Sequence, residues 1–216
     1  LDYHLQSVLA EFYPGAMAHA AELSVLSLSP APELVIISPN DPAAMDQYVR
    51  ECTENGIPYL YDPGQQVVRS DPAELRRGVE GAQSVFVNEY EFELLQKHTG
   101  LRLQDILDRV EYLVVTLGER GVSIYAGGRK IVVPSVPPKQ IMDPTGVGDA
   151  FRGGFVRGVH LGLDWEICGQ MGTLAATYCL ETRGPQEHSY TPEEFVARYR
   201  QHFDDRGALD VLIPDK

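Results

Sequence analysis

Short runs of hydrophobic residues alternate along the chain with segments in which hydrophobic residues recur three and four positions apart. A continuous apolar run is typical of a strand buried on both faces, and the three-and-four spacing is typical of an amphipathic helix. Through the first half of the chain this alternation predicts strands over 8–13, 34–37, 57–61 and 85–87, and helices over 42–55, 72–81, 89–98 and 103–110. Two of these helices begin with Asp-Pro, in which the Asp side chain caps the helix and the Pro fits its first turn.

The second half opens with the same alternation and then changes to a hairpin followed by helices. A strand is predicted over 112–117, and two more over 121–126 and 130–133 are separated by Gly-Gly, which favours an antiparallel hairpin. Helices are predicted over 148–161, 164–181 and 192–202. This order predicts a three-layer α/β/α fold whose sheet is largely parallel with an antiparallel edge hairpin. Because no internal repeat or interdomain linker is visible, we expect one domain over 1–216.

Composition restricts the class of partner. The 216 residues are 44% hydrophobic and carry a formal net charge of −13, so the chain can bury a sizeable core while its acidic surface would repel nucleic acids and anionic membranes. Cys52, Cys168 and Cys179 lack metal-binding spacing, which indicates reduced thiols in a cytoplasmic protein. No apolar run is long enough to cross a bilayer. We therefore expect a cytoplasmic protein without a nucleic-acid or membrane partner.

The segment 143–151, Asp-Pro-Thr-Gly-Val-Gly-Asp-Ala-Phe, places two glycines and a carboxylate at the predicted start of a helix. Gly146 and Gly148 leave the backbone unshielded, so N–H groups can converge on a phosphate at the positive end of the helix dipole. Asp149 would then lie beside that phosphate, where its carboxylate can accept a proton from an attacking hydroxyl. An acidic residue here can equally serve only to stabilise the helix start.

Three further segments follow predicted strands or helices, and each has a structural alternative. Asn88 and Glu91 lie three residues apart after a strand, where they could position water around Mg²⁺ or form a helix capping box. Gly118 and Gly121 form a turn that permits close backbone approach to a nucleotide or that could be an ordinary turn without a ligand. Gly184 follows the long helix and could act only as its C-cap. Local chemistry leaves these alternatives open.

The segment 143–155 resembles the second signature of the PfkB-type (ribokinase-like) carbohydrate kinases, D-T-x-G-A-G-D-x-F. The resemblance implies a ribokinase-like fold and an ATP-dependent kinase that phosphorylates an alcohol group. It assigns the anion hole for the transferred phosphoryl group to the amides of Gly146–Gly148, and the role of catalytic base to Asp149. Pro144 and Val147 replace a Thr and an Ala that are common in the family, and neither replacement removes a catalytic group.

The resemblance also implies roles for two of the other segments. Asn88 and Glu91 match the N-x-x-E motif of the family, which influences the binding of Mg²⁺ and phosphate. The T-x-G-x-x-G segment of the family borders the phosphates and ribose of ATP, and it corresponds here to Thr116, Gly118 and Gly121. These five residues are therefore expected to contact nucleotide or metal.

A monovalent-cation site is implied in the same way. Gly184 lies in a segment similar to the G-A-Q loop of the family, which lies under the adenine and contributes to that site. Asp143 and Thr145, at the start of the signature, are implied as further parts of it, with K⁺ as the expected ion.

The identity of the acceptor is inferred from the sequence similarity of short segments to particular members of the family. In this family the sugar-recognition residues and the β-lid lie mostly in the N-terminal third of the chain, and the lid often forms dimer contacts. This sequence opens at Leu1 in what looks like mid-domain sequence. We therefore expect an upstream part to be absent. A homodimer is compatible with the resemblance. The segments 12–17, 62–65 and 184–186 are most similar to bacterial adenosine-kinase-type members, which favours a nucleoside, and adenosine in particular, over ribose or fructose.

Two other classes of protein share the α/β alternation. A dinucleotide-binding oxidoreductase would carry G-x-G-x-x-G after its first strand, and this sequence lacks that motif. A catalytically silent relative would bind nucleotide without turnover. Both classes remain alternatives to the kinase.

Overall fold

The computed structural model describes residues 14–213, which fall into two compact units that divide after Val110. The strand predicted over 8–13 and the first two residues of segment 12–17 lie outside the described residues. The expectation of a single domain stays a prediction, and each unit is described by itself.

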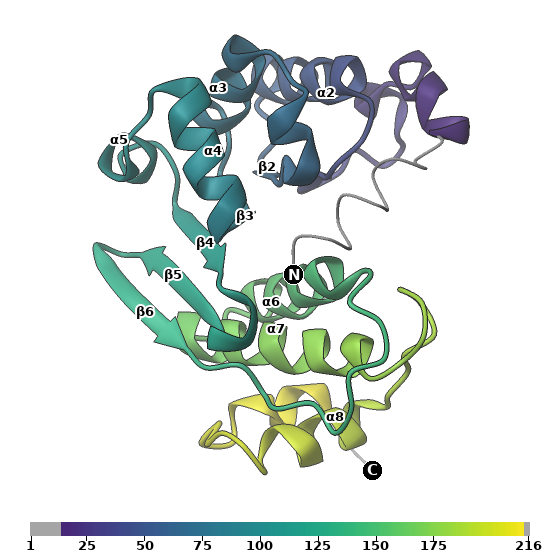
Figure 1. Cartoon of the computed structure of the whole chain (residues 1–216), viewed down its shortest axis with the longest axis vertical. Helices are drawn as coiled ribbons and strands as arrows, with labels where there is room; N and C mark the ends of the chain where they lie inside the picture. Colours follow the sequence, from purple (N-terminus) through teal and green to yellow (C-terminus); the bar gives the residue numbers. More distant parts are fainter. Residues whose placement is uncertain (1–13, 214–216) are drawn as a thin grey trace. The chain divides into compact units, whose positions relative to one another are not determined.

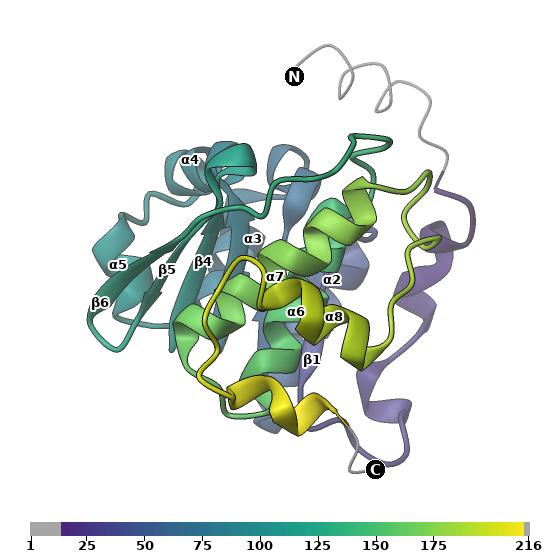
Figure 2. The same cartoon turned by 90° about the horizontal axis from the view of Figure 1, so that it is seen from below.

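The first unit contains three parallel strands, labelled in Figures 1 and 2. They are β1 (Val35–Ile37), β2 (Tyr59–Tyr61) and β3 (Ser84–Asn88), paired in that order. Every residue of β2 is buried, and so is every residue of β3 except Asn88, as their continuous apolar sequences require. The predicted strands of this unit are therefore confirmed within two residues at their starts.

Helices connect and follow these strands. They are α2 (Pro42–Asn55), α3 (Pro72–Glu80), α4 (Glu89–Thr99) and α5 (Leu103–Leu107). Asp41 and Asp71 cap α2 and α3 as predicted, with Pro at the next position of each helix. Three 3₁₀ segments that the pattern did not predict complete the unit: η1 (Gly15–Glu22), η2 (Val25–Ser27) and η3 (Gly64–Val68). Such short helices carry no clear hydrophobic period, so sequence spacing could not reveal them.

The second unit begins with three antiparallel strands. They are β4 (Tyr112–Thr116), β5 (Val122–Ala126) and β6 (Arg129–Val133), and η4 (Gly118–Arg120) lies between the first two. The turn between β5 and β6 contains Gly127 and Gly128, both at positive φ, which confirms the predicted hairpin.

Four helical segments follow: α6 (Val147–His160), α7 (Trp165–Leu180), α8 (Pro192–Tyr199) and η5 (Ala208–Leu212). Helices α6 and α7 run side by side (Figures 1 and 2). Glycines permit this close packing, because an added Cβ at Gly154 would lie 2.7 Å from the Met171 carbonyl oxygen and one at Gly158 would lie 2.9 Å from Cys168 Sγ. The hydrophobic core beside them includes Leu174 and Tyr199, both fully buried.

Two predicted helices are shorter than their hydrophobic patterns indicate. Helix α5 ends at Leu107 instead of 110, and α8 ends at Tyr199 instead of 202. The residues after α8 still turn, but the His202 N–H donates to the Tyr199 carbonyl in a three-residue step that tightens the chain beyond an α-helix. No helix within 14–213 is long and apolar enough to span a membrane.

Candidate active site

The start of α6 has backbone N–H groups that the protein does not use. Gly146 occupies the N-cap position at φ 80° and ψ 0° and has no side chain to cap the helix. The Ala150 N–H is the first to enter the helical pattern, donating to the Gly146 carbonyl at 2.9 Å. Of the amides expected in the anion hole, that of Val147 donates to the Pro144 carbonyl at 3.4 Å, whereas the N–H groups of Gly148 and Asp149 have no hydrogen-bond partner among the described residues. First-turn N–H groups point out of the helix end, so these two can receive an anion.

The loop before α6 is held against the chain that follows α7. The Asp143 carboxylate accepts hydrogen bonds from the Thr145 N–H at 2.9 Å and from the Gly184 N–H at 3.1 Å. Gly146 lies against Pro185 so closely that an added Cβ would be 2.5 Å from the Pro185 Cβ. A side chain at position 146 would therefore clash, in addition to being strained at a positive φ.

The three residues expected at a monovalent-cation site, Asp143, Thr145 and Gly184, are brought together by these hydrogen bonds. The bonds from Thr145, and then the one from Gly184, lower the pKa of Asp143, which keeps its carboxylate charged. Helix α7 ends at Leu180, so Gly184 is not its C-cap and that structural alternative was wrong. Gly184 instead lies in the loop after α7 at φ 87°, and its N–H donates to the Asp143 carboxylate.

Asp149 lies in the first turn of α6, and its side chain is 72% exposed. Its Oδ1 accepts a hydrogen bond from Arg152 Nη2, whose side chain is 9% exposed. Partial loss of water around the carboxylate raises the pKa of Asp149, while a guanidinium in contact favours the charged form. Because Oδ1 is engaged by Arg152, Oδ2 is the oxygen that can accept a proton.

Arg152 was missed as a candidate residue. The available signal was its position three residues after Asp149 on a predicted helix, where the two side chains share a face. A charged residue between Phe151 and Phe155, both buried, was a further indication that it has a partner.

Thr116, Gly118 and Gly121 surround the turn after β4. The Leu117 N–H donates to the Gly121 carbonyl at 2.8 Å, and the Gly121 N–H donates to the Gly118 carbonyl at 3.0 Å. An added Cβ at Gly121 would lie 2.0 Å from the Val133 carbonyl oxygen, so this glycine is needed to bring β5 beside β6. Gly118, at φ 61°, has open space around it and leaves the backbone accessible to a ligand.

Asn88 and Glu91 belong to the first unit and form the predicted capping box of α4. The Glu91 N–H donates to Asn88 Oδ1, and the Asn88 N–H donates to Glu91 Oε2, each at 2.8 Å. Burial raises the pKa of Glu91, and the bond from Asn88 partly opposes that rise. The structural interpretation is confirmed, and Glu91 Oε1 is left without a partner among the described residues, so the metal interpretation stays a prediction.

Within the part of the chain that the structure describes, no three His, Cys, Asp or Glu side chains are grouped to hold a metal ion. A direct protein cage for a divalent cation is therefore not available in residues 14–213.

A glycine at the uncapped start of a helix, in a chain of parallel strands followed by an antiparallel hairpin, is the arrangement expected from the resemblance to the ribokinase-like kinases. The pfkB family carbohydrate kinase pattern matches residues 9–192, and the chain belongs to this family.

Several of the proteins to which the chain is similar are nucleoside kinases. The chain is similar to a nucleoside kinase of Burkholderia thailandensis, solved in complex with inosine, with 34% identity and a TM-score of 0.83 over 87% of this chain and 63% of that one. The same enzyme has been solved with ADP-inosine, again at 34% identity and a TM-score of 0.83, over 87% of this chain and 59% of that one. A nucleoside kinase of Methanocaldococcus jannaschii is 31% identical over 88% of this chain and 62% of its own length. Its structure, described as an archaeal member of the ribokinase family, gives a TM-score of 0.79 over 87% of this chain and 62% of that one.

These similarities confirm the predicted ribokinase-like fold class. The chain spans less than two thirds of the length of these relatives.

Proposed function

We propose that the protein is an ATP-dependent kinase that transfers the γ-phosphoryl group to a hydroxyl of a nucleoside. The observation that carries the proposal is the pair of unpartnered N–H groups at Gly148 and Asp149, with the Asp149 carboxylate in the same helical turn. Membership of the pfkB family and similarity to two nucleoside kinases support the reaction class.

The proposed step is an in-line displacement. The acceptor hydroxyl gives its proton to Asp149 Oδ2, and its oxygen forms a bond to the γ-phosphorus as the bond to the β,γ-bridging oxygen breaks, releasing ADP. The N–H groups of Gly148 and Asp149, with that of Gly146 as the resemblance assigns it, stabilise negative charge on the transferred group. Little covalent chemistry falls to the protein, so positioning and electrostatics account for most of the rate.

Arg152 is proposed to fix the base. Its guanidinium holds one carboxylate oxygen of Asp149, which sets the rotamer and keeps the group ionised before the acceptor arrives. The side chain is almost fully buried, so it acts on Asp149 from within the protein.

Two cations are part of the proposal. Mg²⁺ would neutralise phosphate charge, with Glu91 Oε1 and the Asn88 side chain positioning its water ligands. The residues fit this indirect role because the capping box uses only one oxygen of Glu91. K⁺ would be held near Asp143, Thr145 and Gly184, where Asp143 is kept charged.

For the acceptor we propose a purine nucleoside. The sequences of segments 62–65 and 184–186 favour adenosine, and the structure of the Burkholderia relative was solved with inosine. Thr116, Gly118 and Gly121 are proposed to border the phosphates and ribose of ATP. A cytoplasmic location and a homodimer also stay proposals.

An acceptor-dependent assay tests the function. ADP formation from ATP and Mg²⁺ is measured with adenosine, inosine, cytidine, ribose or fructose, and without acceptor. A nucleoside is expected to give the fastest turnover, with little ADP formed in its absence. ATP binding without turnover for any acceptor would indicate the catalytically silent relative, and faster turnover with ribose or fructose would indicate a sugar kinase.

A further inference from the structure

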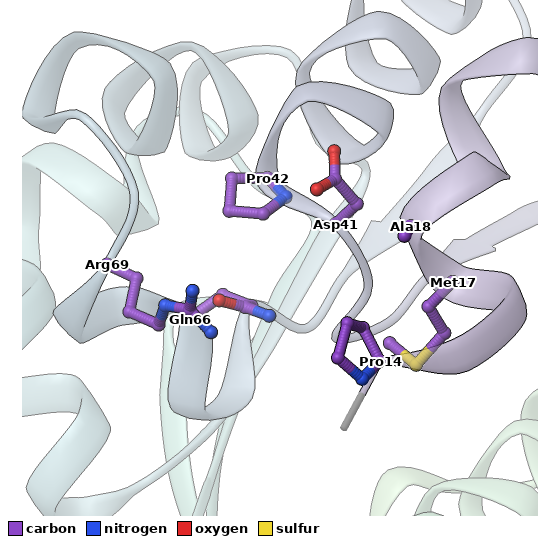
Figure 3. A pocket seen from close by; sticks show the side chains of 7 residues that line it. All are labelled: Pro14, Met17, Ala18, Asp41, Pro42, Gln66 and Arg69. Carbon is purple, nitrogen blue, oxygen red and sulfur yellow. The ribbon is translucent and has the colours of Figure 1, made fainter. Parts of the chain in front are cut away.

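Two buried polar groups take no part in the proposed chemistry. The first is Gln66, which lines a cavity of about 160 Å³ beside η1 (Figure 3). Its Nε2 donates to the Asn40 carbonyl at 2.7 Å, and its Oε1 has no hydrogen-bond partner among the described residues. This cavity follows the carboxyl ends of β1 and β2, where open α/β sheets bind their ligands. The second group is the ion pair of Glu181 with Arg198 in the second unit, which no proposed step explains.

Glu181 and Arg198 are paired by two hydrogen bonds and are largely removed from water. Arg198 Nη1 donates to Glu181 Oε2 at 2.8 Å, and Nη2 donates to Oε1 at 2.6 Å. The two side chains are 14% and 9% exposed, and the guanidinium lies 4.5 Å from the centre of the Tyr178 ring. The bonds from Arg198 lower the pKa of Glu181, which keeps its carboxylate charged. Loss of hydration offsets the attraction within a buried pair, so stability alone does not account for it.

Three consecutive residues at the end of α7 hold the segment 139–145, which leads into α6. Their contacts along this segment join Cys179 Sγ to the Thr145 carbonyl at 3.5 Å, the Leu180 carbonyl to the Met142 N–H at 2.9 Å, and Glu181 Oε1 to the Lys139 N–H at 2.7 Å. The Leu180 carbonyl is fixed by the helix backbone, and Cys179 has a short side chain. Glu181 has a long side chain, so its contact with Lys139 depends on what holds the carboxylate. Arg198 holds it from α8.

The segment 139–145 continues directly into the candidate site. Asp143 is part of it, and the Asp143 carboxylate accepts the Gly184 N–H at 3.1 Å. Gly146, the next residue, occupies the cap position of α6. A displacement of the segment therefore moves the helix start at which the phosphoryl group is proposed to bind. Misplacement by about 1 Å can lower a rate by about 10²-fold even when its source is far from the reacting atoms.

We propose that Arg198 and Glu181 are positioning residues for phosphoryl transfer: Arg198 holds the Glu181 carboxylate where it accepts the Lys139 N–H, and that bond fixes the loop before α6. The inference rests on the proposed function for its effect on turnover, whereas its effect on the loop does not depend on a function. Arg198 lies beyond residue 192, where the match to the family pattern ends. The proposal therefore adds α8 to the elements that place the site.

Arg198→Met tests the proposal, with Arg200→Met as its matched control. Arg200 follows α8 and pairs with Asp205 and Asp210, which belong to no loop of the candidate site. ADP formation is measured at a temperature at which both variants are folded. Arg198→Met is expected to lower kcat by about 10–100-fold, because the unpaired Glu181 carboxylate turns toward water and releases Lys139. Arg200→Met is expected to keep kcat within about twofold of wild type, and the KM for the nucleoside should change little in either variant.

Two double variants separate positioning from packing. Arg198→Met with Glu181→Gln removes the unpaired charge and keeps an amide oxygen that can accept the Lys139 N–H, so it is expected to regain most of the lost kcat. Arg198→Met with Glu181→Met also removes the charge but has no acceptor, so it is expected to stay slow. If Arg198→Met alone does not fold, these two variants make the comparison without it. Equal kcat values in the two double variants would overturn the inference.

Hydrogen exchange reports on the loop without any need for turnover. Amide exchange over residues 139–146 is expected to be faster in Arg198→Met than in wild type, and to stay near the wild-type rate in Arg200→Met. Unchanged exchange over this segment in Arg198→Met, or an equal loss of kcat in Arg198→Met and Arg200→Met, also overturns the inference. A wild type that forms no ADP with any acceptor but shows the expected exchange would reject the kinase and retain the positioning of the loop.

Discussion

Helices α4 and α6 both begin at segments that the sequence marks as parts of a nucleotide site, yet their first turns differ. At α4, Asn88 and Glu91 satisfy each other's backbone N–H groups through a capping box. At α6, the cap residue is Gly146, which has no side chain, and two N–H groups stay without partners among the described residues. One helix start is closed by its own side chains and the other is left open.

A missing side-chain cap does not by itself indicate a binding site, since α7 also begins without a cap hydrogen bond from Asp164, but α6 adds a glycine at the cap position. Asp41, Asp71 and Thr191 close α2, α3 and α8 with their side chains, as Asn88 closes α4. A glycine cap such as Gly146 costs a few tenths of a kcal/mol relative to Asn, Asp or Ser. At the start of α6 a bound anion could accept the hydrogen bonds that a capping side chain would otherwise accept. The amides of Gly148 and Asp149 are therefore available as the proposed direct ligands of an anion, whereas Asn88 and Glu91 can contact a ligand only through the side-chain atoms that the capping box does not use.

The largest expected effect is at the catalytic base. Asp149→Asn should lower kcat by about 10²–10⁴-fold, because the amide cannot take up the proton, while ATP binding and the melting temperature stay near wild type. Steady-state ADP formation and thermal unfolding measure the two effects. Asp164→Asn, an exposed helix-start acid in the same unit, is the matched control. Near wild-type turnover in Asp149→Asn would contradict the proposed role.

Substitutions at Gly146 and Gly148 should differ, because the first glycine is needed for the backbone conformation and the second is proposed to leave room for the anion. Gly146→Ala should destabilise the fold by about 1–3 kcal/mol, because the new Cβ is strained at positive φ and meets Pro185. Gly148→Ala meets no atom within 4 Å, so it should keep the melting temperature while its methyl hinders the anion and lowers turnover by about tenfold. Equal losses of stability in the two variants would show that the loop has no special ligand role.

Arg152 should tune Asp149 and therefore the pH profile. Removing the guanidinium in Arg152→Met destabilises the charged carboxylate and raises the pKa of Asp149, so the acidic limb of kcat/KM should move to higher pH. Turnover at neutral pH should fall by about tenfold. Arg152→Lys keeps the charge and should retain the acidic limb near its wild-type position. A limb that does not move in Arg152→Met would show that the contact is only structural.

The smallest effects are expected at α4. Asn88→Ala should cost about 1 kcal/mol of stability by removing the cap. Glu91→Gln keeps a residue that can complete the box. Burial raises the pKa of Glu91, so the folded state binds its proton more tightly and stability falls as pH rises through 4.5 toward the raised value. Glu91→Gln should therefore remove this pH dependence in thermal unfolding and raise the Mg²⁺ concentration for half-maximal activity several-fold. An unchanged Mg²⁺ requirement would leave Glu91 a capping residue only.

Much of the fold could be predicted because local signals agree with the packing. Asp-Pro pairs mark the starts of α2 and α3, and Gly56, at φ 66°, ends α2 as the Asn-Gly signal indicates. The ends of α5 and α8 were placed too late, because apolar spacing continues after the backbone has tightened into shorter turns. Packing decides where such a helix stops, and the pattern does not record it.

The candidate site was predictable in part. The glycine spacing and the carboxylate at the start of α6 pointed to the uncapped helix start and to Asp149 in its first turn, since these depend on residues adjacent in sequence. Local sequence could not choose between a helix cap and a ligand loop for Gly184, because its partner, the Asp143 carboxylate, lies far away in the chain. The Gln66 acceptor has no sequence signal, because its unpaired state depends on which end of the amide meets Asn40.

The sequence by itself determined the order of strands and helices, the family, and which residues are the candidates for binding phosphate and accepting a proton. Each of these follows from the identity and spacing of neighbours along the chain, which fix local backbone preference and local chemistry. Only the tertiary structure decided that Asp149 is held by a buried Arg152, that α6 is left uncapped while α4 is closed, and that an unpaired oxygen faces a cavity beside η1. Hydrogen-bond partners and burial are properties of packed surfaces, and packing joins residues that the linear order separates.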